Sequence, residues 1–176
     1  MFIKKQEIDS IRDNKVTYIK NFVDLKKQYD FNLLSRLVEE TDAETKVKAK
    51  NLTDVMRGVY QMKNIKNHFK EFVTFFDFLK KLFNYEDNVS DEVDLFFSFC
   101  SLVGMPHADP EDVFIICLHG ITTYRIFSDK DVDIVLNKGD MIYIPRGIKH
   151  KVLAITPRVI ASFGYYGKKL NGIINS

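Results

Sequence analysis

The 176-residue sequence has no tryptophan, only two cysteines and four prolines, and no long uncharged segment. Two cysteines in a chain of this length do not form a disulfide framework, so we expect the fold to hold without disulfides. No run approaches the roughly 18 uncharged residues of a membrane-spanning helix, and charged residues begin at Lys4, so no signal peptide is predicted. With 45% hydrophobic and 28% charged residues, the chain is expected to be one cytoplasmic globular domain over residues 1–176.

A large charge of one sign is also absent. The 26 basic and 24 acidic residues give a net charge of +2, which is no electrostatic footprint for nucleic acid. We therefore expect neither a nucleic acid nor a membrane as partner, and a substrate that is a peptide or a small molecule. The number of phenylalanines in the first half is compatible with a homodimer through its helices.

Glycine and proline are scarce in the first half. Seven of the eight glycines and all four prolines follow residue 90. Because both residues mark turns, chain reversals should be frequent after residue 90 and rare before it. Residues 1–90 are therefore predicted to be mainly helical, and residues 91–170 to be rich in strands.

Hydrophobic periodicity supports the helical prediction. Apolar residues recur at steps of three and four between residues 65 and 83, which predicts an amphipathic helix. Shorter helices are predicted at 24–40 and 54–62, and an alternating strand at 15–22. Since this spacing is what a helix needs to pack on a sheet, the phenylalanines of the longest helix are interpreted as core residues and not as a cofactor site.

The second half contains short apolar runs of strand length, separated by glycine, proline or aspartate. Such a series predicts an antiparallel sandwich or barrel, and with the helices an α+β fold. The predicted strands are 93–103, 112–118, 121–127, 132–136, 141–145, 150–155 and 158–166.

Three polar residues of this half have the pattern of a metal site. His107 and Asp109 are two positions apart, so in an extended chain their side chains leave the same face. His150 begins a later strand, and it returns to the first pair if the sheet closes on itself. Two imidazoles and one carboxylate that leave other coordination positions open suit non-haem Fe(II), although zinc accepts the same ligands.

The remaining histidines and the cysteines have simpler interpretations. His119 ends a strand out of phase with the ligand pattern, and His68 lies in the predicted amphipathic helix. Cys100 and Cys117 lie in apolar runs, where a free cysteine behaves as a small hydrophobic residue. All four are expected to be structural.

Two segments resemble a known family. HADPEDVFIICLHGITTYRIF (107–127) and KGDMIYIPRGIKHKV (138–152) resemble the two motifs of the cupin superfamily, and within it the Jumonji-C and asparaginyl-hydroxylase-like oxygenases. Asp109 stands where ordinary cupins have a second histidine, and Val113 where they have a glutamate, which favours the oxygenases. The similarity covers about residues 94–167, and the first half has no counterpart in it.

The resemblance implies a cupin or jelly-roll barrel, called a double-stranded β-helix, with a helical first half packed on it. His107, Asp109 and His150 would be the catalytic metal ligands and hold Fe(II), with 2-oxoglutarate as co-substrate. The implied activity is that of a dioxygenase that hydroxylates a peptide, an amino acid or a small metabolite. The alternative is a metal-binding cupin that does not use 2-oxoglutarate, either a small-molecule dioxygenase or isomerase or a non-enzymatic ligand-binding protein.

The distal carboxylate of 2-oxoglutarate requires a cation, and the position that carries lysine or arginine in the closest group is Thr122 here. Arg158, eight residues after His150, resembles the arginine of prolyl-hydroxylase-like oxygenases, and strand parity counted from Ser162 turns it inward. The other interpretation of Arg158 is a surface residue after a proline turn. Thr122, Tyr124 and Ser162 would offer hydroxyls to the same carboxylate, whereas Arg125 alternates outward.

Overall fold

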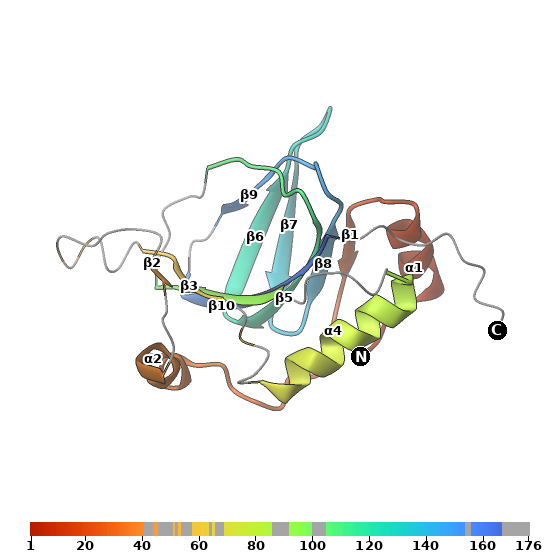
Figure 1. Ribbon diagram of the computed structural model, residues 1–176. Helices are drawn as coiled ribbons and strands as arrows, with labels where there is room; N and C mark the ends of the chain where they lie inside the picture. The colour runs from red at the N-terminus through yellow and green to blue at the C-terminus, as the bar shows by residue number, and fades with distance from the viewer. Residues whose placement is uncertain are drawn as a thin grey trace.

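The computed structural model describes residues 1–40, 44–45, 51, 53, 58–63, 65, 69–85, 92–99, 105–153 and 156–166. Two antiparallel sheets form the centre of this part of the chain, and helices lie against one of them (Figure 1). The larger sheet has the strand order β1-β8-β5-β10-β4-β3-β2 and the smaller sheet the order β7-β6-β9. The helices are α1 (Lys5–Arg12), α2 (Phe31–Glu40) and α4 (Lys70–Phe83); the strands are β1 (Thr17–Ile19), β2 (Glu44–Thr45), β3 (Tyr60–Met62), β4 (Glu92–Ser98), β5 (Asp112–His119), β6 (Ile121–Ile126), β7 (Val132–Asn137), β8 (Met141–Ile144), β9 (His150–Leu153) and β10 (Arg158–Tyr165).

The larger sheet is the middle of three layers, because both of its faces are buried. In β5, Phe114 and Ile116 join a core cluster with the helices, whereas Val113 and Ile115 join a second cluster with the smaller sheet. Alternate residues of a strand point to opposite faces. Because both faces of β5 are buried, its sequence is a continuous apolar run. The space between the two sheets is therefore the interior of a barrel.

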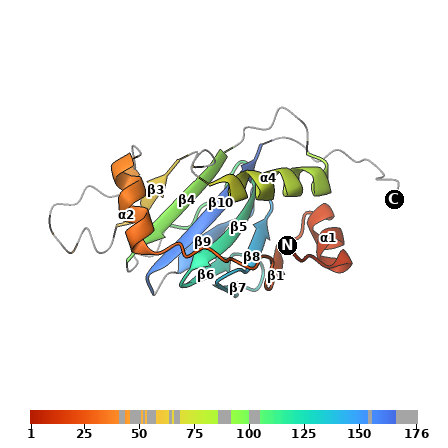
Figure 2. The same cartoon turned by 90° about the horizontal axis from the view of Figure 1, so that it is seen from below.

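Helix α4 covers the outer face of the larger sheet (Figure 2). Phe72 meets Phe163 edge to face at 5.9 Å, and Phe76 stacks on Tyr165 at 4.6 Å. The helix ends at Phe83, and the following residue, Asn84, has the left-handed conformation (φ 51°) that commonly terminates helices. The interpretation of the α4 phenylalanines as core residues is confirmed. No helix in the described part of the chain is long and apolar enough to cross a membrane.

All seven strands predicted after residue 90 are present, as β4 to β10. The structure does not show the mainly helical first half that was predicted. The helices described there have 8, 10 and 14 residues, and the same half adds β1, β2 and β3 to the larger sheet. The strand predicted at 15–22 is present as β1. β2 and β3 were not predicted; they have two and three residues, too few for periodicity to identify, and they are strands because other parts of the chain pair with them.

The helix boundaries differ from the prediction for local reasons. Helix α2 begins at Phe31 and not at residue 24, because the carboxylate of Asp30 accepts the amide of Leu33 at 3.0 Å and caps the helix. The predicted helix at 54–62 is wrong for residues 60–62, which form β3, while 54–57 lie outside the described residues. His68 and Cys100, which were expected to be structural, also lie outside the described residues. Helix α1 was not predicted from the sequence.

Asp140 joins the N-terminal segment to the barrel. Its carboxylate is 1% exposed and accepts hydrogen bonds from the Tyr18 hydroxyl (2.8 Å), the Asn21 amide (2.8 Å) and the Asn137 amide (2.9 Å). Burial and the hydrogen bond that the Tyr18 hydroxyl donates to Asp140 raise the pKa of Tyr18 to about 12. The aspartate of the second motif therefore fixes β1 along the edge of β8.

Replacing Asp140 with alanine is expected to lower the free energy of unfolding by about 2–4 kcal/mol, because three donors lose their buried acceptor. Urea unfolding monitored by circular dichroism measures this difference. Asp133→Ala is the matched control, since Asp133 pairs with Arg125 on the exposed face and its loss should change stability very little. Equal effects of the two substitutions would contradict the role assigned to Asp140.

Candidate metal centre

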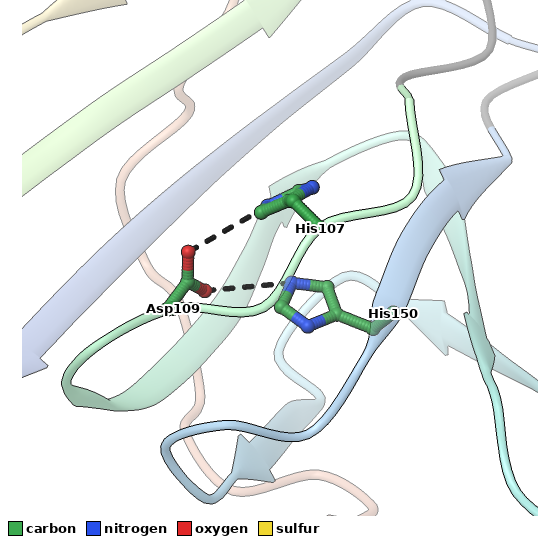
Figure 3. A group of neighbouring side chains, drawn as sticks. All are labelled: His107, Asp109 and His150. Carbon is green, nitrogen blue, oxygen red and sulfur yellow. Dashed lines mark ion pairs between the residues drawn. The ribbon is translucent and has the colours of Figure 1, made fainter.

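Three side chains from two distant segments meet at one mouth of the barrel (Figure 3). One ligand atom from each of His107, Asp109 and His150 lies within 4.8 Å of the others. Asp109 is central, with Oδ1 3.6 Å from Nε2 of His107 and Oδ2 3.5 Å from Nε2 of His150. The side chains that the spacing predicted to converge do converge.

Backbone pairing produces this convergence. The His107 amide donates to the His150 carbonyl at 2.9 Å, and the His150 amide donates back at 2.8 Å, which forms an isolated antiparallel bridge. The Gly147 amide donates to the Asp109 carbonyl at 2.9 Å. The turn before β9 therefore holds the two segments of the site at a fixed separation.

The two imidazoles are oriented through their second nitrogens. Nδ1 of His107 lies 3.0 Å from the Met105 carbonyl, and Nδ1 of His150 lies 3.0 Å from the Ile148 carbonyl. Because a carbonyl only accepts, Nδ1 is the donor in each of these contacts, and Nε2 of each ring is the nitrogen directed at Asp109. Metal-binding histidines characteristically have this arrangement.

Burial favours the neutral form of one ring. It lowers the pKa of His150, against the opposing effects of the Ile148 carbonyl and of Asp109. The His150 side chain is only 3% exposed, whereas that of Asp109 is 26% and that of His107 is 51% exposed. The group therefore has one buried ligand and an open side toward solvent, where further ligands of a metal can bind.

The barrel interior behind the three residues contains a buried cation. Arg158 is 5% exposed and lies on the inner face of β10, together with Ile160 of the inner core cluster. Burial lowers its pKa, against the effects of Tyr124 and Cys117 nearby. The prediction that parity turns Arg158 inward is confirmed, and the alternative of a surface arginine is excluded.

Tyr124 lies near both Arg158 and the cluster of His107, Asp109 and His150. Its ring centroid is 6.2 Å from that of His150, and its pKa is raised by burial, while Arg158 acts to lower it. Thr122 lies on the same inward face of β6, with Thr122 1% and Tyr124 2% exposed. The two predicted residues of β6 thus line the interior between the three clustered side chains and Arg158.

The buried atoms of this interior without a hydrogen-bond partner in the described part of the chain include Nη1 of Arg158 and Oγ1 of Thr122. Leaving such a group unpaired costs about 1–3 kcal/mol, so a polar pair of this kind is expected to receive a ligand. A carboxylate fits both atoms, since a guanidinium and a hydroxyl donate and a carboxylate accepts.

The other predicted residues are placed as follows. Ser162 is half-buried on the inner face of β10. Arg125 points outward and forms a paired contact with Asp133 at 2.7 Å, so it takes no part in this interior. His119 lies edge to face with Phe31 at 6.2 Å, and Cys117 is buried as a free thiol.

Sequence reasoning missed one buried hydroxyl, that of Ser98 at the end of β4. Its partner strand is β10, and the register places it opposite Arg158. The alternation of apolar residues in β4 signals which face Ser98 occupies, but the sequence carries no signal for this register.

Residues 127–172 match the family model of the JmjC domain. The matched segment includes His150 and Arg158 and begins after His107 and Asp109. No sequence among the curated proteins matches the chain.

Solved structures with a similar fold include a ribosomal oxygenase and an α-ketoglutarate-dependent carbocyclase. The ribosomal oxygenase YcfD of Escherichia coli, in complex with cobalt and succinic acid, has a TM-score of 0.70 and 18% identity over 89% of this chain and 49% of that chain. YcfD with cobalt and 2-oxoglutarate has a TM-score of 0.67 and 18% identity over the same shares. SnoK, a non-haem α-ketoglutarate-dependent carbocyclase of nogalamycin biosynthesis, has a TM-score of 0.68 and 10% identity over 93% and 83%.

The chain spans about half the length of the YcfD structures, and it covers most of SnoK. The resemblance that the two motifs predicted is confirmed: residues 127–172 match the JmjC domain family, and the chain has a fold similar to those of YcfD and SnoK.

Proposed function

We propose that the protein is an Fe(II)- and 2-oxoglutarate-dependent oxygenase whose barrel is a double-stranded β-helix. The observation that carries the proposal is one interior with two complementary parts: a cluster of two imidazoles and a carboxylate at its mouth, and the buried guanidinium of Arg158 behind it. The first part suits Fe(II), and the second suits the distal carboxylate of a dicarboxylic co-substrate. The JmjC match and the fold of YcfD and SnoK support it.

His107, Asp109 and His150 would hold the metal through Nε2, a carboxylate oxygen and Nε2. With the metal and 2-oxoglutarate bound, the centre would use oxygen to oxidise a C–H bond of a second substrate. The protein's own contribution is geometric. The Met105 and Ile148 carbonyls hold each imidazole in the ligating tautomer, and the bridge between His107 and His150 fixes the spacing of the two rings.

Arg158 would pair with the distal carboxylate, and the hydroxyls of Thr122, Tyr124 and Ser162 would donate to it. The resemblance implies a lysine or arginine at position 122; in this chain the threonine there is accompanied by a cation on β10. Both β6 and β10 face the same interior, so a cation from either strand can serve the same carboxylate. The low dielectric constant of the interior strengthens such a pair.

For the second substrate we propose a peptide or a protein loop. The side chain of His107 is 51% exposed at the mouth, so the site opens directly to the surface, where a segment of a larger molecule can reach it. YcfD, the fold of which is similar, is described as a ribosomal oxygenase. A small metabolite, by contrast, needs a pocket that encloses most of its surface.

The test is co-substrate turnover. Protein loaded with Fe(II) without oxygen, then mixed with 2-oxoglutarate and oxygen, should convert 2-oxoglutarate to succinate at a rate that depends on Fe(II), and an inert 2-oxoglutarate analogue should inhibit it. Calorimetry with Mn(II) in place of Fe(II) measures binding independently of turnover. Metal binding without any 2-oxoglutarate binding would contradict the proposal and favour a cupin that does not use this co-substrate.

A further inference from the structure

Arg146 lies in the turn between β8 and β9, and both its side chain and its backbone are bound to the barrel. Its Nε donates to Oδ1 of Asp112 at 3.3 Å, and its terminal nitrogens donate to the carbonyls of Tyr165 (3.3 Å) and Tyr166 (3.4 Å). The Arg146 amide donates to the same oxygen of Asp112 at 3.0 Å. Asp112 begins β5 and Tyr165 ends β10, and the two residues are paired across the sheet. One residue of the turn is therefore fixed to the same end of two neighbouring strands.

Asp112 is the buried centre of these contacts. It is 3% exposed, and its second oxygen, Oδ2, accepts the hydroxyl of Tyr85 at 2.8 Å. Tyr85 follows helix α4 and stacks on Tyr165 at 4.5 Å. Burial and the carboxylate of Asp112 raise the pKa of Tyr85, so its hydroxyl stays protonated and donates. Because both oxygens of the carboxylate accept hydrogen bonds, Asp112 is a well-defined anchor for the turn.

The turn that is anchored in this way contacts two of the three residues of the candidate metal centre. The Gly147 amide donates to the Asp109 carbonyl at 2.9 Å, and the Ile148 carbonyl lies 3.0 Å from Nδ1 of His150. Gly147 has φ +78°, a left-handed conformation that favours glycine. A displacement of the turn would therefore move the backbone of Asp109 and rotate the ring of His150 together.

The stability of the barrel should depend only modestly on the Arg146 guanidinium. The Arg146 side chain is 38% exposed, and partly exposed ion pairs contribute little to stability. Without the guanidinium, the Asp112 carboxylate still accepts the Tyr85 hydroxyl and the amide of residue 146. The planar guanidinium is instead bound by acceptors in fixed directions, which sets the orientation of the turn residue that carries it.

We propose that Arg146, held by Asp112, is a positioning residue for the metal centre, and that the pair fixes the turn that presents Asp109 and His150 to the ion. The inference rests on the proposed function, because it concerns the metal that the three residues would hold. Asp112 lies three positions after Asp109, and Arg146 lies four positions before His150. Each of the two motifs thus supplies both a ligand and an anchor, and the two anchors bind each other.

The test is the binding of a divalent metal ion, with two readouts. Arg146→Met should weaken Mn(II) binding, measured by calorimetry, on the order of tenfold, which is the lower end of the effect of groups that orient metal ligands. The visible absorption spectrum of bound Co(II), which reports the geometry of its ligands, should change as well. Arg146→Lys keeps the charge beside Asp112 but not the planar fork, so it should give an intermediate affinity.

Two control variants separate positioning from stability. Arg125→Met removes a guanidinium of similar exposure (39%) that pairs with Asp133 on the outer face of β6, and it should change neither readout. Tyr85→Phe removes a hydrogen bond from the other oxygen of Asp112 and leaves the contacts of Arg146 in place. It should lower the thermal midpoint more than Arg146→Met does, because a buried acceptor loses a buried donor, yet it should weaken Mn(II) binding less.

The outcomes separate the two proposals. If the unchanged protein binds Mn(II) and Arg146→Met matches it in affinity or in the Co(II) spectrum, the role of Arg146 is overturned and the proposed function stands. The role is also overturned if Tyr85→Phe weakens metal binding as much as Arg146→Met, because affinity would then follow stability. Should Arg146→Met fail to fold, Arg146→Lys replaces it in both comparisons, and a normal affinity of that variant would overturn the role.

Binding by the unchanged protein tests the proposed function itself. A protein that binds Mn(II) but not 2-oxoglutarate contradicts the proposed function, and the two readouts still decide the role of Arg146, which concerns the metal alone. If the unchanged protein binds no divalent metal ion, the proposed function fails, and the role of Arg146 fails with it.

Discussion

Replacing Asp109 with alanine is expected to reduce the affinity for a divalent metal ion by more than about 100-fold, because Asp109 is the carboxylate that both imidazoles face. The fold should remain intact, since the Asp109 side chain is partly exposed and belongs to no core cluster. His107→Ala should behave in the same way. Calorimetry with Mn(II) measures the affinity, and circular dichroism during heating measures the stability.

The control for the Asp109 substitution is Asp131→Ala, which removes the same charge from an exposed loop position between β6 and β7. It should leave metal binding unchanged. Unchanged metal affinity in both Asp109→Ala and His107→Ala would show that the three clustered residues are not ligands. Global unfolding of both variants would show that their role is structural.

Replacing Arg158 with methionine is expected to weaken 2-oxoglutarate binding by at least about 100-fold, because a buried charge pair loses one partner. Metal binding should hardly change, since Arg158 acts on the other end of the co-substrate. The ligand-free protein should become more stable by about 1–3 kcal/mol, because a buried cation with an unpaired Nη1 is replaced by an apolar side chain of similar length.

Calorimetry and urea unfolding test the two parts of the Arg158 prediction separately. Arg158→Lys should give an intermediate affinity, because lysine keeps the charge but loses the planar fork that binds a carboxylate through two hydrogen bonds. Arg125→Met on the outer face of β6 is the control, and it should bind the co-substrate normally. An Arg158→Met variant with normal 2-oxoglutarate affinity would remove Arg158 from the site.

The second half of the fold was predictable because its signals are local. In β6, Thr122 and Tyr124 alternate with Thr123 and Arg125, and the structure buries the first pair and turns Arg125 outward. The spacing of His107 and Asp109, and the turn before His150, were also readable along the chain. The convergence of the three residues required only that the strands close into a barrel.

The parts that sequence reasoning missed depend on distant pairing. Tyr60–Met62 is a strand because it pairs with β4, and no pattern within three residues distinguishes a strand from a helix. The position of Ser98 opposite Arg158 depends on a register between strands sixty residues apart in the chain. The link between Tyr18 and Asp140 spans 122 positions, and neither residue signals it alone.

The position of β1 at the edge of the larger sheet has a consequence for how the chain can be divided. Thr17–Ile19 pairs with β8, and β3 pairs with β4 closer to the other end of the sheet, so both borders of the strand-rich half are completed by the first 62 residues. A fragment that starts near residue 91 would carry both sequence motifs, yet it would expose the unpaired amides and carbonyls of β8 and β4. Unpaired strand edges of this kind pair readily with other chains, so we expect that fragment to self-associate.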